Sequence, residues 1–140
     1  MTHMWIRIYF ILVVLWASQI CGAQSLFDRS KMLLGRIDLN GHAYNRSNMS
    51  VGRILKDGRI VDDSNMIIGK IEKDGIIRDR SNMSIGKVDG DGVVKDKNNM
   101  QIGRVKSDGT VVDRNNKTIG YAKGIPMRYA AVFFFFKMFG

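Results

Sequence analysis

The chain has 140 residues, which is enough for one small domain, and it carries a formal net charge of +9 at pH 7. Its one cysteine and two histidines do not have the spacing of a zinc site, and no glycine-rich loop is followed by Lys-Ser or Lys-Thr. The composition therefore excludes a zinc module and a P-loop nucleotide-binding protein.

Residues 1–23 have the features of a cleaved signal peptide. Arg7 precedes an apolar run at residues 8–17, and Cys21-Gly22-Ala23 offers small residues for cleavage after Ala23. An uncleaved membrane anchor is a second interpretation, although the run is shorter than the roughly 20 residues of a spanning helix. Lipid attachment at Cys21 is a third. We expect an exported protein that resides in the periplasm, at the outer membrane or outside the cell.

A unit of 17 residues recurs along nearly all of the remaining chain. One glycine marks each copy, and we call this set the repeat glycines: Gly35, Gly52, Gly69, Gly86, Gly103 and Gly120. A second turn signal follows each of the first five: Asn40-Gly41, Asp57-Gly58, Asp74-Gly75, Asp91-Gly92 and Asp108-Gly109. An asparagine closes each copy: Asn48, Asn65, Asn82, Asn99 and Asn116. These signals interrupt every possible helix, so the unit predicts short strands.

One copy illustrates the prediction. Residues 68–72 and 76–79 form two strands joined by a turn at Asp74-Gly75, where the Asp-Gly pair favours type I′ geometry. A second turn follows, in which Asp79 and Asn82 can bond their own backbone and Asn82 tolerates the left-handed conformation. Apolar residues lie one position before and two positions after each repeat glycine. A regular strand would point those two positions to opposite faces, so we predict a bulge at the glycine.

The two ends of the repeat region each carry half a unit. Residues 27–32 resemble a second half, and residues 118–122 are a first half. Paired half units would close a ring and leave no exposed edge. We therefore predict an all-β fold over residues 24–124, a closed ring of short antiparallel β-hairpins from five 17-residue repeats. Five full copies plus one pair of half units leave both five-fold and six-fold closure open.

The repeat resembles that of a known family. The pattern I-G-[KR]-[IV]-x-x-D-G-x-[IV]-x-D-x-S-N-M recurs five times with variations, behind a signal peptide and ahead of an aromatic C-terminal run. Over Phe27 to Gly140 the chain resembles small exported bacterial proteins known as five-fold β-flower proteins. The resemblance implies a closed flower of β-hairpin petals and no established activity. The chain departs from the pattern at Asn40, Ala43, Asn45 and Lys117.

Residues 125–140 form a separate aromatic segment. Pro126 suits the first turn of a helix and Ala130-Ala131 favours one, while four consecutive phenylalanines also suit a strand. We predict a short helix in preference to a strand. The segment either plugs one end of the ring, the interpretation we favour, or docks on a membrane or partner. The residues concerned are Tyr129, Phe133, Phe134, Phe135, Phe136 and Phe139.

The sequence offers little for catalysis. His42 is the one histidine after the signal peptide, and a dyad would have to pair it with Ser47 or Ser50. Polar turn contacts explain these residues better. We therefore predict a protein that is not an enzyme, with no catalytic residue and no cofactor.

Two sets of charged residues would form circles in a closed ring. The acidic set ends each second strand: Asp62, Asp79, Asp96 and Asp113, with Asp28 or Asn45. The basic set follows each repeat glycine: Arg36, Arg53, Lys70, Lys87 and Arg104. The acidic circle could bind calcium and the basic circle an anionic ligand. The interpretation we favour is that each aspartate caps its own turn and each base pairs with a neighbouring acid, which predicts no metal site.

The sequence thus predicts an exported, non-enzymatic structural or interaction module with an unidentified protein or cell-envelope partner. The alternative is a ligand-binding module for calcium or an anionic saccharide. Contact with a membrane surface would use the C-terminal segment. Nucleic acid is the weakest partner for an exported protein, and we expect none.

Overall fold

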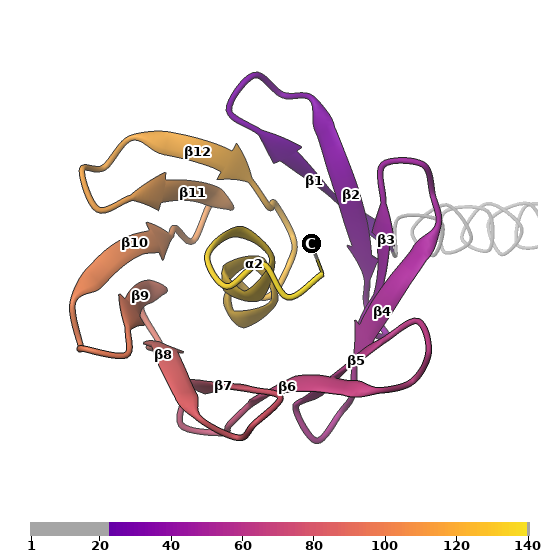
Figure 1. Ribbon diagram of the computed structural model, residues 1–140. Coiled ribbons are helices and arrows are strands. Elements are labelled where there is room, and N and C mark those ends of the chain that lie inside the picture. The colour runs from indigo at the N-terminus through magenta and orange to yellow at the C-terminus, as the bar shows by residue number, and fades with distance from the viewer. Residues whose placement is uncertain (1–22, 140) are drawn as a thin grey trace, which may run out of the picture.

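The structure is a computed structural model that describes residues 23–139. Twelve antiparallel strands form a closed barrel around a central helix (Figure 1). The strands are β1 (Ala23–Asp28), β2 (Leu33–Asp38), β3 (His42–Asn45), β4 (Ser50–Ile54), β5 (Arg59–Asp62), β6 (Ile67–Ile71), β7 (Ile76–Asp79), β8 (Ser84–Val88), β9 (Val93–Asp96), β10 (Gln101–Val105), β11 (Thr110–Asp113) and β12 (Thr118–Tyr121). The helix is α2 (Met127–Phe134). Apart from Ala23, the predicted signal peptide lies outside the described residues.

Closure joins the two half units. Strand β1 pairs with β12 through Phe27 opposite Tyr121 and Asp28 opposite Gly120, and its other edge pairs with β2. Every other strand pairs with its neighbours in sequence. The predicted closed ring of hairpins is therefore confirmed. The ring contains five complete units and one pair made from the two chain ends, so it has six repeat glycines around its axis.

The two kinds of turn lie at opposite ends of the barrel. The glycine rim consists of turns 38–42, 55–59, 72–76, 89–93 and 106–110, together with the chain around residues 122–125. The asparagine rim consists of turns 28–32, 45–49, 62–66, 79–83, 96–100 and 113–117. The rims alternate along the chain because each strand crosses the wall once.

The Asp-Gly turns differ from the prediction. A type I′ turn needs positive φ at both central residues, but at turn 55–59 only Gly58 has one, at +93°. The Gly58 N–H donates to the Leu55 carbonyl at 2.9 Å, and the Leu55 N–H donates to the Arg59 carbonyl at 2.8 Å. These bonds define a type I turn followed by a bulged glycine. The type I′ prediction is wrong because Asp57 stays out of the left-handed region and Gly58 alone enters it.

The Asn turns use the same geometry with asparagine in place of glycine. Asn65 has φ +66°, its N–H donates to the Asp62 carbonyl at 3.0 Å, and the Asp62 N–H donates to the Met66 carbonyl at 2.9 Å. The predicted left-handed asparagine is confirmed in every full copy. One turn design, with Gly or Asn at its last position, therefore serves both rims.

A bulge interrupts the wall beside every repeat glycine. Ile67 lies opposite Val61 and Gly69 lies opposite Ile60, which leaves Ile68 without a partner residue. The same register shift leaves out the corresponding residue in the other copies: Leu34, Val51, Ile85, Ile102 and Ile119. The predicted bulge is confirmed. It lets Ile68 contact the core even though Gly69 and Ile71 also lie on the inner face.

The interior is apolar throughout the described residues. Two layers of buried side chains line the half of the barrel nearer the glycine rim, one from each strand of a unit: Ile37, Ile54, Ile71, Val88, Val105 and Ala122, and Leu26, Ala43, Ile60, Ile77, Val94 and Val111. Helix α2 fills the axis, where Ala130, Ala131 and Val132 have no exposed surface. No polar or charged residue in 23–139 is buried.

Helix α2 enters from the glycine rim and runs along the axis. Ile125 and Pro126 lead into it, and the Pro126 carbonyl accepts bonds from the N–H groups of Tyr129 and Ala130. Arg128 fixes this end, since its guanidinium donates to the backbone carbonyls of Glu72 and Lys73 at 3.3 and 2.9 Å. The preferred prediction of a helix for this segment is correct.

The repeat glycines predict a sharp position dependence of stability. A methyl group at Gly86 would lie 2.5 Å from the Lys95 carbonyl oxygen and 2.5 Å from the Phe136 ring. Gly86→Ala should therefore lower the free energy of unfolding by about 1–3 kcal/mol, measured by urea denaturation. Gly90→Ala is the matched control, because nothing lies within 4 Å of its added methyl. Equal effects of the two substitutions would contradict this packing.

Candidate functional site

The end of the chain meets the repeat glycines one side chain at a time. A Cβ atom placed on a repeat glycine would collide with one C-terminal side chain, a different one for each of five copies. The pairs are Gly120 with Phe134, Gly103 with Phe135, Gly86 with Phe136, Gly69 with Met138, and Gly52 with Phe139. We call these five C-terminal residues the axial cluster.

Each pair depends on the absence of a side chain on the wall. Every repeat glycine also lies against a carbonyl oxygen of the adjacent strand, 2.7 Å from an ideal Cβ at Gly69 and 2.5 Å at Gly86. Any larger residue would push the strands apart and remove the space that a phenylalanine ring now fills. Glycine is thus required at these positions for two reasons: it allows the adjacent strand to lie close, and it leaves room for the axial cluster.

The chain reaches this arrangement by leaving the helix after Phe134. The N–H groups of Phe135 and Phe136 both donate to the Ala131 carbonyl, at 2.9 and 3.3 Å. Lys137 then adopts φ +50°, which turns the chain so that Met138 and Phe139 face the remaining glycines. Lys137 itself is exposed between them.

The residues predicted to plug or dock lie in three places. Phe134, Phe135, Phe136 and Phe139 belong to the axial cluster. Phe133 packs edge-to-face on Phe134, with ring centroids 5.4 Å apart. Tyr129 lies near the glycine rim, beside Arg128 in a hollow that includes Gly58 and Glu72. The phenylalanines are half-buried rather than fully buried, because the cluster lies where the barrel opens at the asparagine rim.

The acidic set does not converge on one point. Asp79 accepts two bonds from its own turn, from the N–H groups of Ser81 and Met83 at 2.9 and 3.0 Å. The same pair of bonds recurs at Asp28, Asn45, Asp62, Asp96 and Asp113. Among the described residues, no three His, Cys, Asp or Glu side chains gather as metal ligands would. Each aspartate of the set is the first residue of its turn, and its side chain binds the backbone of that turn.

Two aspartates of the glycine rim have lowered pKa values. The backbone N–H of Arg59 is the main cause at Asp57, and that of Thr110 is the main cause at Asp108. Both carboxylates are exposed. Their ionised forms favour the folded state above the ordinary aspartate pKa of 3.8, and this contribution is lost as the pH falls below it.

The basic set has varied partners. The Arg36 guanidinium donates to Asn48 Oδ1 and lies over the Tyr44 ring at 4.1 Å, and Arg53 donates to Asn65 Oδ1 at 3.3 Å. Lys70 Nζ lies 3.8 Å from Glu72 Oε1, and Arg104 Nε donates to the Asp91 carbonyl at 3.4 Å. Only Lys70 meets the expected acid. The arginines bind turn amides and carbonyls instead.

Away from the strand ends, every charged residue of the outer wall is basic. The basic wall consists of Arg36, Arg53, Lys70, Arg78, Lys87, Lys95 and Arg104, while the acidic residues lie at strand ends or in turns. Lys87 lies directly opposite Lys95, and Lys70 directly opposite Arg78. Glu72 offsets the second pair, with its Oε1 3.2 Å from Arg78 Nε. Like charges directly opposite each other destabilise a sheet, so the Lys87–Lys95 pair has an energetic cost.

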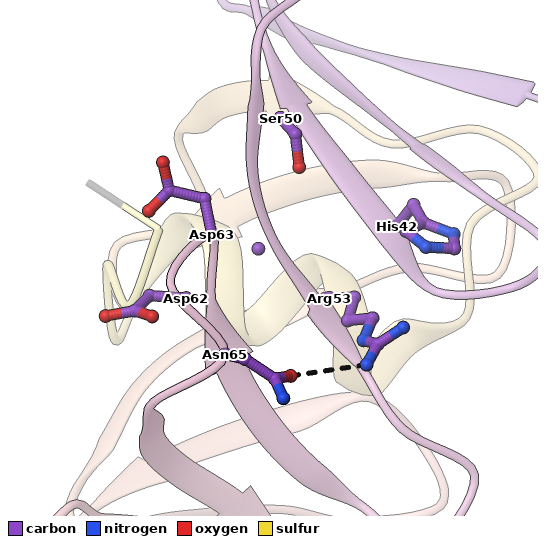
Figure 2. A pocket seen from close by; sticks show the side chains of 7 residues that line it. His42, Ser50, Arg53, Asp62, Asp63 and Asn65 are labelled. Carbon is purple, nitrogen blue, oxygen red and sulfur yellow. Dashed lines mark hydrogen bonds between the residues drawn. The ribbon is translucent and has the colours of Figure 1, made fainter.

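A shallow hollow of about 230 Å³ lies on the wall and rim of the first copies, lined by His42, Ser50, Gly52, Arg53, Asp62, Asp63 and Asn65 (Figure 2). His42 Nδ1 lies 3.7 Å from an oxygen of Asp38. Within residues 23–139, no hydrogen bond joins His42 to Ser50 or to Ser47. The hollow brings His42 and Ser50 to one surface without the contact that a nucleophile and its base require.

Two features of the structure were not predicted from the sequence. The match between axial cluster and repeat glycines has no local signal, because it joins the last residues to every copy. The second feature is a methionine after five of the six left-handed turn residues of the asparagine rim: Met32, Met49, Met66, Met83 and Met100, each 60–64% exposed. The 17-residue pattern already contained that methionine, so its regular recurrence was the available signal.

The comparisons with known proteins concern the fold. The sequence model of the family described as 5-fold beta-flower protein matches residues 23–138. No curated protein and no solved structure matches the chain. In the part of the chain that the structure describes, no helix is long and apolar enough to cross a membrane.

The turn aspartates give a test that separates capping from calcium binding. Asp79→Ala removes both acceptor bonds and should lower stability by about 1–2 kcal/mol. Asp79→Asn should be nearly neutral, because Asn45 makes the same two bonds in the first copy, at 2.9 and 3.0 Å. The measurement is the thermal midpoint of each variant with calcium and with a chelator. A calcium-dependent midpoint that Asp79→Asn abolishes would show that the carboxylates bind metal.

Proposed function

The chain belongs to the 5-fold beta-flower protein family, and on that premise we propose that it is an exported, non-enzymatic interaction module. The family description names a fold and no activity. In this proposal the interior serves only to hold the ring rigid, and binding takes place on the outer surfaces. The partner is a protein or another component of the cell envelope.

One observation carries the proposal. The barrel interior is occupied by helix α2, the axial cluster and two layers of aliphatic side chains. Residues 23–139 contain no polar or charged residue that is buried as a whole, and none of their individually buried side-chain nitrogen or oxygen atoms lacks a hydrogen-bond partner. Enzyme sites are concave and place a few polar groups in an apolar setting, which this interior does not provide.

Export is supported by the sequence of residues 1–23. Cleavage after Ala23 would remove one residue of β1 and leave the pairs from Gln24 to Phe27 with β2 in place. The lone cysteine would leave with the signal peptide, so the mature chain would carry no thiol into an oxidising compartment.

A second candidate function is binding of an anionic saccharide on the basic wall. The observation that favours it is the Lys87–Lys95 pair, two lysines that lie directly opposite each other on adjacent strands. A polyanion lying across β8 to β10 would offset their repulsion, and Arg104 would extend the contact by one strand. Calcium has less support, because each aspartate of the acidic set already accepts two backbone bonds on its own turn.

Site-specific photocrosslinking in producing cells tests the proposal and distinguishes the two candidates. A photoreactive residue at position 87 reports on the basic wall, and one at Lys56 on the glycine rim is the matched control. We expect discrete adducts from position 87 and none from position 56. Protease-sensitive adducts indicate a protein partner, whereas protease-resistant adducts that polysaccharide-degrading enzymes remove indicate a saccharide. Absence of any adduct from the wall and from a matching set on the asparagine rim would contradict an interaction module.

A further inference from the structure

The asparagine rim carries a circle of exposed thioethers. Met32, Met49, Met66, Met83 and Met100 occupy the same turn position in successive copies, each 60–64% exposed, and Lys117 takes the sixth position. Their backbones are fixed, because each N–H donates to the acid or amide that begins the turn. Leu33 and Ile67 beside them are 43% and 51% exposed. Turn chemistry accounts for the aspartate and asparagine at each turn but does not require methionine.

This circle surrounds an apolar hollow at the centre of the same rim. The hollow, about 250 Å³, is lined by Leu34, Phe133, Phe134, Lys137 and Phe139. Leu34 is two residues from Met32, which places hollow and circle at one end of the barrel. The rim therefore presents half-buried aromatic rings at its centre and flexible, polarisable methionines at its edge. Exposed apolar side chains gathered on one face are typical of an interaction site.

The charges around the circle indicate an anionic partner. Eight exposed lysines and arginines lie on this rim: Arg29, Lys31, Arg46, Arg80, Lys97, Arg114, Lys117 and Lys137. Within residues 23–139, none of the eight forms an ion pair. Five of the six aspartates on the rim turn a carboxylate oxygen toward their own backbone, as described above. The eight cations are thus exposed and form no ion pair among the described residues, although Lys31 Nζ lies 5.9 Å from the Tyr121 ring centroid, while most of the acids are held close to the rim.

A second copy of the chain is a poor occupant. Face-to-face pairing about a two-fold axis brings identical patches together. It would bring Lys137 and the surrounding cations close to their own copies, at the centre of the contact. An anionic lipid surface instead offers phosphates to the cations and an apolar boundary to the methionines and phenylalanines.

We propose that the asparagine rim docks face-on onto an anionic membrane surface, with the five methionines and the central hollow in the interfacial layer and the eight cations against lipid phosphates. The inference builds on the interaction module proposed above and assigns its partner on this rim. It does not involve the basic wall. It also differs from membrane contact through the C-terminal segment alone, since the repeats supply the methionines and seven of the eight cations.

The methionines themselves provide the probe. The full chain is exposed to dilute hydrogen peroxide, and sulfoxide formation at each methionine is followed by peptide mass spectrometry. The reactions are compared without vesicles, with phosphatidylcholine vesicles, and with vesicles containing one-third phosphatidylglycerol. Met127, near the glycine rim, is the internal control. Ala23, where the described chain begins, pairs with Asp38 and therefore lies near the glycine rim. Membrane attachment through residues 1–22 would thus start at the end of the barrel opposite the asparagine rim and would not shield that rim.

We expect anionic vesicles alone to slow oxidation of the five rim methionines, with Met127 unchanged. Changing all five to serine should weaken binding to anionic vesicles roughly tenfold, and Arg46→Gln with Arg80→Gln and Arg114→Gln should abolish it at physiological salt. Lys87→Gln with Lys95→Gln on the basic wall is the matched charge control and should leave the protection unchanged.

Three results would overturn the proposal. The first is an oxidation rate at the rim methionines that anionic vesicles do not change. The second is equal protection by zwitterionic and anionic vesicles. The third is concentration-dependent protection without vesicles, which would identify a second copy as the occupant. All three leave the interaction module intact if crosslinks form at position 87, so failure of this docking and failure of the broader function are distinguishable.

Discussion

The contact between the repeat glycines and the axial cluster is the constraint on which the rest of this fold depends. Strands of four to six residues cannot bury an apolar face by themselves. A ring of six strand pairs leaves a central space too wide for its own aliphatic layers to fill, and helix α2 with five large side chains occupies it. The glycines leave room for those side chains, while the bulge beside each glycine keeps the preceding aliphatic residue against the core. Ring and axis therefore stabilise each other.

The packing of the interior limits where a binding site could lie. The interior is filled by packing, so in the proposed interaction module binding would use one of three outer surfaces with different chemistry. Away from the strand ends the wall carries only positive charges, the asparagine rim combines methionine with exposed cations, and the glycine rim carries aspartates such as Asp57 and Asp108, with lowered pKa values. A 17-residue repeat produces such surfaces readily, because a residue type at one position of the unit recurs in every copy and so forms a circle around the barrel.

Much of the fold could be predicted from the sequence, because the repeat encodes local chemistry. Asn65 and Gly58 mark the turns, and the apolar spacing around Gly69 indicates a bulge. The type I′ assignment failed because Asp-Gly fits two hairpin turns, and the sequence does not show whether Asp57 has positive φ. The pairing of Phe136 with Gly86 could not be predicted, since it depends on how the last residues meet a ring that the repeats must first close. The partners of Arg36 and Arg53 could not be predicted for a similar reason, because Asn48 and Asn65 become their neighbours only through strand register.

The measurement that most directly tests this account is thermal unfolding of the chain with and without residues 129–140. We predict that deletion abolishes the cooperative transition, because the barrel would then enclose an unfilled apolar space and its buried repeat glycines would face that space. A synthetic peptide of residues 125–140, added to the shortened chain, should restore the transition. A midpoint that stays within a few degrees of the intact chain would contradict the account, and would show that the ring closes and holds without its axis.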